Sequence, residues 1–297
     1  MDHSTALRDA VAIACAMLTA LANGLGVTAQ HLASTSSTTL DRGWRFIMFL
    51  ARHPLWLVGW IAMGGSLLFQ SLALHFAAMS VVQPILVFEL VLALVVRRLW
   101  LHQRVARRAW TASMVTVLAL GLFLVATTRQ SGLASHLRWS IPSAISVAVV
   151  VLLVLGGRRG SPGRRAALLG SATAVLWALE AAFIKECTDV ITRGGFSGLV
   201  ASWSFYAFIG CGIAGLVVEQ TALHVGPLRS SQTAIVVVDP LVSVVLGAWI
   251  FGEHLGTTWS WRVIALLSLL VTLVSARILI ASTPDTMEAS PVVHRIA

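Results

Sequence analysis

The chain has 297 residues, of which 57% are apolar and only 11% are charged, and its formal net charge is +9. This composition excludes an ordinary soluble core and leaves no room for a separate soluble domain. The basic residues lie at helix ends and in connectors, without a basic helix or an aromatic platform, which argues against nucleic acid as a partner.

Nine stretches of about 20 largely uncharged residues match the length that an α-helix needs to cross a bilayer. They cover 11–30, 55–75, 80–101, 110–128, 139–155, 166–187, 199–224, 230–251 and 261–280. The sequence therefore predicts an all-α polytopic membrane protein, with residues 1–297 forming a single membrane domain. The polar residues 282–297 predict a disordered cytoplasmic tail.

Two segments admit a second interpretation. Residues 44–50, in the connector 32–53, fit a helix that lies along the membrane interface or part of a tenth, broken span. The N-terminal apolar run imitates a signal peptide with a small-residue cleavage site near Ala20. Apolar character continues to Ala29, however, and Asp2 and Asp9 precede it, so we interpret this run as the first helix.

The basic residues predict the orientation, because cytoplasmic loops accumulate Lys and Arg. One face and the C-terminal tail carry 15 of the 21, namely Arg42, Arg45, Arg52, Arg97, Arg98, Arg104, Arg107, Arg108, Arg158, Arg159, Arg164, Arg165, Arg229, Arg277 and Arg295. The other six are Arg8, Arg129, Arg138, Lys185, Arg193 and Arg262. We therefore expect an outer N-terminus and a cytoplasmic C-terminus in the plasma membrane.

The two halves of the chain resemble each other. Ala-Leu-His at 73–75 recurs at 222–224, and helix 11–30 aligns with 166–187 so that Gln30 lies opposite Lys185. Repeat one (11–128) and repeat two (166–280) are joined by a linking helix, 139–155, and enter the membrane in opposite directions. This inverted 4+1+4 repeat is the architecture of many secondary transporters. Because apolar sequences align easily, a chance match stays open.

Four acids, Glu89, Glu180, Glu219 and Asp239, fall well inside the predicted spans, where an ionised side chain costs roughly 3 kcal/mol. Glu89 and Asp239 lie at similar depth in repeat-related helices, near the bilayer midplane. Two such acids beside a central cavity can bind a cation or exchange a proton for it, because a low dielectric disfavours the ionised form. A protonated acid that merely hydrogen-bonds to a neighbouring helix is the structural alternative.

Proline accompanies both acids. Pro84 and Pro240 each free a backbone carbonyl, which predicts kinked or opened helices nearby. A second register aligns Gln83-Pro84 with Asp239-Pro240 and would leave Glu89 without an acidic counterpart. We favour the first register because it needs no gap inside a helix.

Other polar residues extend the predicted substrate-binding or coupling site. They are Glu180 and Lys185 in 166–187, Glu219 in 199–224, Gln70 in 55–75, and Asn23 and Gln30 in 11–30. Lys185, the sole lysine, could meet an anionic substrate group, pair with Glu186 or Asp189, or extend to the interface. The neutral side chains also fit a role as hydrogen-bonding contacts between helices.

Several motifs do not indicate catalysis. Gly-Cys-Gly-Ile-Ala-Gly at 210–215 matches a dinucleotide fingerprint but follows no strand, so we expect it to allow close helix packing. No Walker loop, nucleophile–base pair or zinc-ligand spacing is present in the sequence. We therefore expect no enzyme activity, no metal site and no cofactor.

The second half carries Ala-Leu-His at 222–224, Asp239-Pro240 and Gly-Glu-His-Leu at 252–255. The first half carries Ala-Leu-His at 73–75, Gln83-Pro84 and a decayed His-Gln-Arg-Val at 102–105. Over 11–280 this pattern resembles the EamA-like branch of the drug/metabolite transporter (DMT) superfamily. That branch usually has ten helices and two cytoplasmic termini, so the first helix is missing here and transport after its loss stays open. The resemblance also implies that the chain is related to a magnesium transporter that has nine helices.

These observations predict a secondary transporter that exports a small metabolite or drug-like solute and is coupled to protons. A divalent-cation transporter or channel is the second hypothesis, and a membrane-embedded enzyme or non-transporting scaffold is the third. The expected partners are the lipid bilayer, a small solute, and a proton or cation. A homodimer is left open.

Overall fold

The computed structural model describes residues 3–35, 53–99, 106–126, 139–226, 228–253 and 258–282. Within these ranges the chain forms ten helices and no strand. They are α1 (His3–Thr35), α3 (Pro54–Phe76), α4 (Met79–Leu86), α5 (Glu89–Leu99), α6 (Arg107–Ala126), α7 (Ser140–Gly156), α8 (Pro162–Ala201), α9 (Trp203–Val225), α10 (Leu228–Phe251) and α11 (Trp259–Ser282). Each predicted span coincides with one helix, except 80–101, which is divided between α4 and α5.

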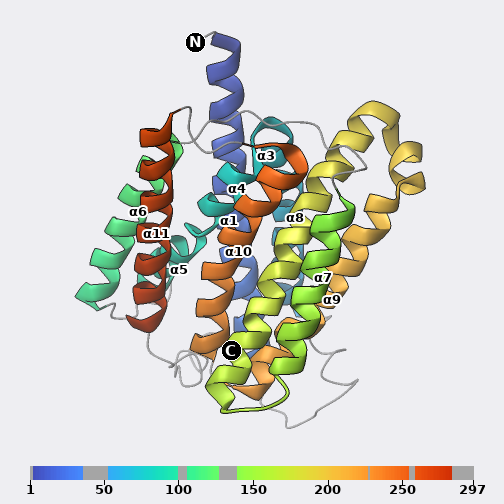
Figure 1. Cartoon of the computed structure of the whole chain (residues 1–297). Coiled ribbons are helices and arrows are strands. Elements are labelled where there is room, and N and C mark those ends of the chain that lie inside the picture. The colour runs from blue at the N-terminus through green and yellow to red at the C-terminus, as the bar shows by residue number, and fades with distance from the viewer. Residues whose placement is uncertain are drawn as a thin grey trace.

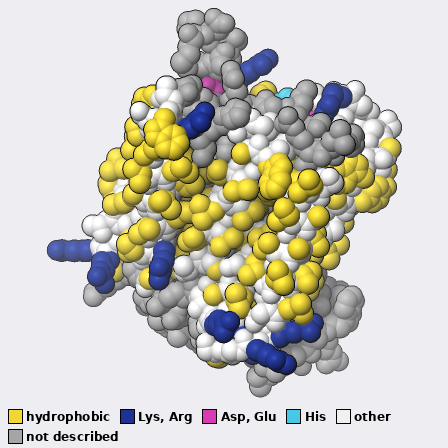
Figure 2. Space-filling model, in the orientation of Figure 1, with side chains coloured by type: hydrophobic (Ala, Val, Ile, Leu, Met, Phe, Trp, Pro, Cys, Tyr) yellow, Lys and Arg dark blue, Asp and Glu magenta, His cyan; other side chains and the backbone are white. Residues whose placement is uncertain are grey.

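The molecule is a polytopic membrane protein, as predicted. Seven helices in the described ranges are long and apolar enough to cross a bilayer, and two shorter apolar segments, Met79–Leu92 and Ser140–Gly156, accompany them. Apolar side chains form a band across the face in Figure 2, with Lys and Arg side chains at its upper and lower edges. The count of nine spans stays a prediction. Residues 44–50 and the tail 283–297 lie outside the described residues.

The third predicted span is broken beside its proline. α4 ends at Leu86 and α5 begins at Glu89, so the α-helical ladder stops two residues after Pro84. Across the break, Phe88 N donates to Ile85 O at 2.9 Å and Val91 N donates to Phe88 O at 3.0 Å, which are tighter, 3₁₀-type bonds. The opened backbone predicted here is therefore present. In the second half of the chain, α10 continues as one helix through Pro240.

The predicted end of the sixth span was wrong. α8 continues past Cys187 to Ala201, with a bend at Gly195, whose φ is +64°. Glycine adopts this left-handed conformation without steric cost, so the helix can turn at this point. Apolar composition marks only the buried part of a helix, and the polar continuation of α8 carries no such signal.

The helices pack as pairs of neighbours. α1 packs along α3, α8 lies between α9 and α10, and α6 packs along α11. In Figure 1, α6 and α11 stand side by side at one edge of the molecule, with α7, α8 and α9 at the other. The main apolar core is formed largely by alanines and medium-sized side chains such as Leu179 and Leu269, with Phe123 fully buried among them. Small residues let the helix backbones approach closely.

Candidate functional site

Glu89 is held at the junction of three helices. It is the first residue of α5, and its side chain lies against α1, because a Cβ added at Gly24 would be 3.6 Å from its Cγ. The Asn23 side chain hydrogen-bonds to Glu89. Asn23 Oδ1 in turn accepts a hydrogen bond from Ser66 Oγ of α3 at 2.6 Å. The predicted site residues Asn23 and Glu89 are therefore neighbours, and Glu219 of α9 is close enough to interact with Glu89 electrostatically.

Asp239 has a comparable environment in the second half. Ser243 Oγ, one turn further along α10, donates a hydrogen bond to Asp239 Oδ1 at 3.2 Å. Glu180 of α8 interacts electrostatically with Asp239. The Glu180 side chain is accommodated by a glycine, because a Cβ added at Gly212 of α9 would lie 2.8 Å from Glu180 Oε1.

Two of the predicted acids thus lie within electrostatic range of a second one, Glu89 of Glu219 and Asp239 of Glu180, and we call these combinations the acid pairs. All four side chains are partly buried. That Glu89 and Asp239 act together, as the sequence suggested, stays a prediction. Two carboxylates in a poorly solvated environment repel each other, so such a pair favours a shared proton or a bound cation.

Gln83 contributes an amide on α4. Its side chain is 2% exposed, and its Nε2 has no hydrogen-bond partner; the same holds for the hydroxyl of Ser80, one turn earlier on the helix. A buried donor without a partner costs about 1–3 kcal/mol, so these two groups are suited to a polar molecule that would satisfy them. Gln70 on α3 is partly buried, whereas the side chain of Gln30 lies outside the described residues.

Lys185 has a partner that the sequence did not reveal. Its side chain is 2% exposed, so the predicted extension to the interface was wrong. Lys185 Nζ lies 3.5 Å from Glu253 Oε1 and donates to the carbonyls of Leu74 and Ala77 at 3.4 and 3.3 Å. These carbonyls belong to the last turn of α3 and the residue after it, where the helix leaves acceptors unpaired.

Glu253 caps the next helix. Its Oε1 accepts a hydrogen bond from the Met79 backbone N–H at 2.7 Å, and its Oε2 accepts one from Ser80 N–H at 2.8 Å. These are donors of the first turn of α4, where a carboxylate is favoured by the unpaired N–H groups and by the helix dipole. We call Lys185 and Glu253 the buried bridge. Together they satisfy both sides of the break between α3 and α4, which lies at the buried residues Ala77 and Ala78.

Two glycines allow Glu253 to reach this position. Gly252 has a φ of +66°, which turns the chain back over the end of α10, and Glu253 N then donates to Gly247 O at 3.1 Å. A Cβ added at Gly247 would collide with Glu253 Oε2 and lie 3.0 Å from its Cδ. The Gly-Glu pair in 252–255, noted only as a family-like motif, is therefore the signal that could have identified this residue.

The glycine-rich run 210–215 serves helix packing, as predicted. A Cβ at Gly215 would lie 2.8 Å from Trp177 Nε1, and one at Gly212 would meet Glu180, so α9 approaches α8 closely along this face. At Gly210 an added Cβ would meet nothing within 4 Å. The described residues contain no group of three or more His, Cys, Asp or Glu side chains arranged to hold a metal ion.

Comparison with known proteins adds one relative. No family model matches the chain, and no solved structure matches it. An uncharacterized protein of Corynebacterium glutamicum is 29% identical to it over 243 residues, which cover 80% of this chain and 82% of that protein. The similarity thus extends over most of both chains. The name of the relative does not state an activity.

Proposed function

We propose that the chain is a secondary transporter that moves a small solute across the plasma membrane, with export as its direction. The observation that carries the proposal is the presence of four partly buried acids inside apolar helices, where Glu89 lies within electrostatic range of Glu219 and Asp239 within that of Glu180. Embedded acids are costly and mark ion or substrate pathways in membrane proteins. The resemblance to the EamA-like DMT transporters favours the same function.

The proposed architecture is the inverted repeat. In its support, α1 packs along α3 just as α8 packs along α9, and the last helices of the two repeats, α6 and α11, pack on each other. Each repeat also places an acid of its proline-bearing predicted span, Glu89 or Asp239, near a polar residue of its first helix, Asn23 or Glu180. Substrate would bind between the repeats, near these residues.

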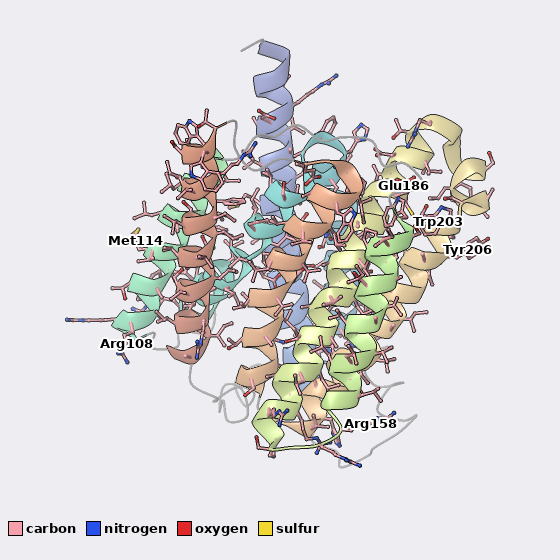
Figure 3. All side chains as sticks on the ribbon, viewed as in Figure 1. Arg108, Met114, Arg158, Glu186, Trp203 and Tyr206 are labelled. Carbon is pink, nitrogen blue, oxygen red and sulfur yellow. The ribbon has the colours of Figure 1, made fainter. Side chains whose placement is uncertain are left out.

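The proposed orientation places the N-terminus outside and the C-terminus in the cytoplasm. Arg108 and Arg158 come from two loops assigned to the cytoplasmic side, and both lie at the lower end of the bundle in Figure 3, whereas Glu186 and Trp203 lie toward the upper end. Basic residues from separate loops at one end agree with the positive-inside rule.

Coupling follows from the acid pairs. When a pair holds a proton, the repulsion between its carboxyl groups is relieved; release of that proton leaves a site for a cationic group of the solute. Asn23 and Ser243 orient Glu89 and Asp239 by hydrogen bonds. Binding of either species changes the charge at the interface between the two repeats, which is the region that must rearrange during alternating access.

Neutralisation of the acids tests this function. The solute is first identified by an untargeted comparison of metabolites exported by cells with and without the protein, and its flux is then measured in liposomes. Glu89→Gln and Asp239→Asn should each lower the flux at least about tenfold and abolish its dependence on pH, as expected for a lost coupling group. The matched control is Asp189→Asn, which removes an acid on α8 that belongs to neither acid pair. Unchanged flux in the double variant would refute the coupling role.

A divalent cation is the second candidate substrate, because paired carboxylates are ligands that Mg²⁺ accepts. The same liposomes, loaded with a fluorescent Mg²⁺ indicator, distinguish it: uptake of Mg²⁺ that is lost in both acid variants would assign the ion as the substrate. A non-transporting scaffold or an embedded enzyme predicts that neither solute nor ion crosses.

A further inference from the structure

We propose that the buried bridge, Lys185 with Glu253, is a gate that closes the outer end of the protein. This inference rests on the proposed function and deepens it, because it assigns the state that the structure represents and the residues that hold it. In this state the outer end is closed, and the protein opens more readily toward the cytoplasm.

The bridge joins the two repeats. Glu253, which follows α10, and Lys185, on α8, belong to repeat two, whereas the four backbone groups that they bind belong to the α3–α4 break in repeat one. α4 also packs against α10 and lies beside its upper end in Figure 1. If the repeats move relative to each other during transport, these contacts must break at this end. A purely intra-repeat capping interaction would persist in both states.

Aromatic residues enclose the bridge. Phe251 lies under Lys185, with Nζ 5.0 Å from the ring centre, and contacts Trp139 at a centroid distance of 6.0 Å. Trp139 stacks on Phe183 at 4.8 Å, and Trp203 packs edge-on against both. In this water-poor environment the charge interactions are strong, and they weaken once water enters. The bridge therefore has the two alternatives, dry and closed or wet and open, that a gate requires.

A single thiol beside Glu89 reports which side is open. Cys15, Cys187 and Cys211 are replaced by alanine, and Gly24→Cys is introduced, since its Cβ would lie 3.6 Å from Glu89 Cγ without a clash. A membrane-impermeant maleimide is added from outside to right-side-out vesicles or from the cytoplasmic side to inverted ones. The bridge is then neutralised on both sides at once, as Lys185→Met with Glu253→Gln, so that no buried charge is left alone.

We expect faster labelling from the cytoplasmic side in the protein with the bridge. In the neutralised variant, labelling from outside should rise by about tenfold or more and labelling from the cytoplasm should fall, which is a population shift between two states. Asp189→Asn, which removes an acid near Lys185 without touching α4, should leave both rates unchanged. Unchanged sidedness in the neutralised variant, or a rise from both sides together, would overturn the gate.

A second measurement separates this result from misfolding and from failure of the proposed function. Lys185→Met/Glu253→Gln protein should still elute as a single species in detergent; if it does not, Lys185→Gln/Glu253→Gln, which keeps an amide at each position and leaves no buried charge alone, takes its place. Solute flux by the protein with the intact bridge tests transport itself. If the protein with the bridge transports solute but the neutralised variant is labelled from the same side as before, only the gate is refuted. If the side of labelling changes but the protein with the bridge transports no solute, only the transport function is refuted.

Discussion

Gly247→Ala tests whether Glu253 holds α4 in place. The new methyl group would collide with Glu253 Oε2 and lie 3.0 Å from Cδ, so the carboxylate must move away from the Met79 and Ser80 N–H groups. Each hydrogen bond to a charged group contributes about 1.5–3 kcal/mol, so the loss of both costs about 4 kcal/mol. Alanine also stabilises the helix by about 1 kcal/mol relative to glycine, because of its higher helix propensity. We therefore expect a net destabilisation of about 3 kcal/mol.

The assay is unfolding in mixed micelles by increasing sodium dodecyl sulfate, followed by circular dichroism. The matched control is Gly210→Ala in α9, where an added Cβ meets nothing within 4 Å, and it should be neutral or slightly stabilising. In a Glu253→Ala background, Gly247→Ala should cost nothing further, because the colliding carboxylate is gone. An equal cost with and without Glu253 would refute the explanation.

Two further predictions concern helix packing. Gly215→Leu should destabilise the protein by about 1–3 kcal/mol in the same unfolding assay, because the side chain would overlap Trp177, whereas Gly210→Leu should have little effect. Thr116→Val should cost less than about 1 kcal/mol, since it removes one contact of 2.8 Å between α6 and α11, to the hydroxyl of Ser275. A cost for Thr116→Val that persists in a Ser275→Ala background would show that this hydrogen bond is not its cause.

The helices were predictable because membrane spans are defined by composition alone. A long apolar run has few alternatives in a bilayer, so α3, α9 and α10 begin and end within a few residues of their predicted spans. The opening after Pro84 was predictable for a local reason, the loss of a backbone donor. The packing of 210–215 followed from the absence of any strand before it.

Contacts between distant residues could not be predicted in this way. Lys185 was conspicuous as the sole lysine, but Asp189, four residues further along α8, was the only acid that helix periodicity placed beside it. Glu253 reaches it only because Gly252 reverses the chain and Gly247 leaves space. Likewise, the pairing of Asp239 with Glu180 depends on how α10 packs against α8, which periodicity does not determine.

The buried acids therefore fall into two classes that call for different chemistry. Glu253 has a lysine and two backbone donors, so its charge is fully compensated by the protein itself. Glu89, Glu219, Asp239 and Glu180 instead have another acid nearby, and Asn23 and Ser243 supply only neutral donors. A charge that the protein does not compensate must be compensated by something that arrives, either a proton or a cationic ligand. The first class is suited to hold a conformation, and the second to bind and release a proton or a cation.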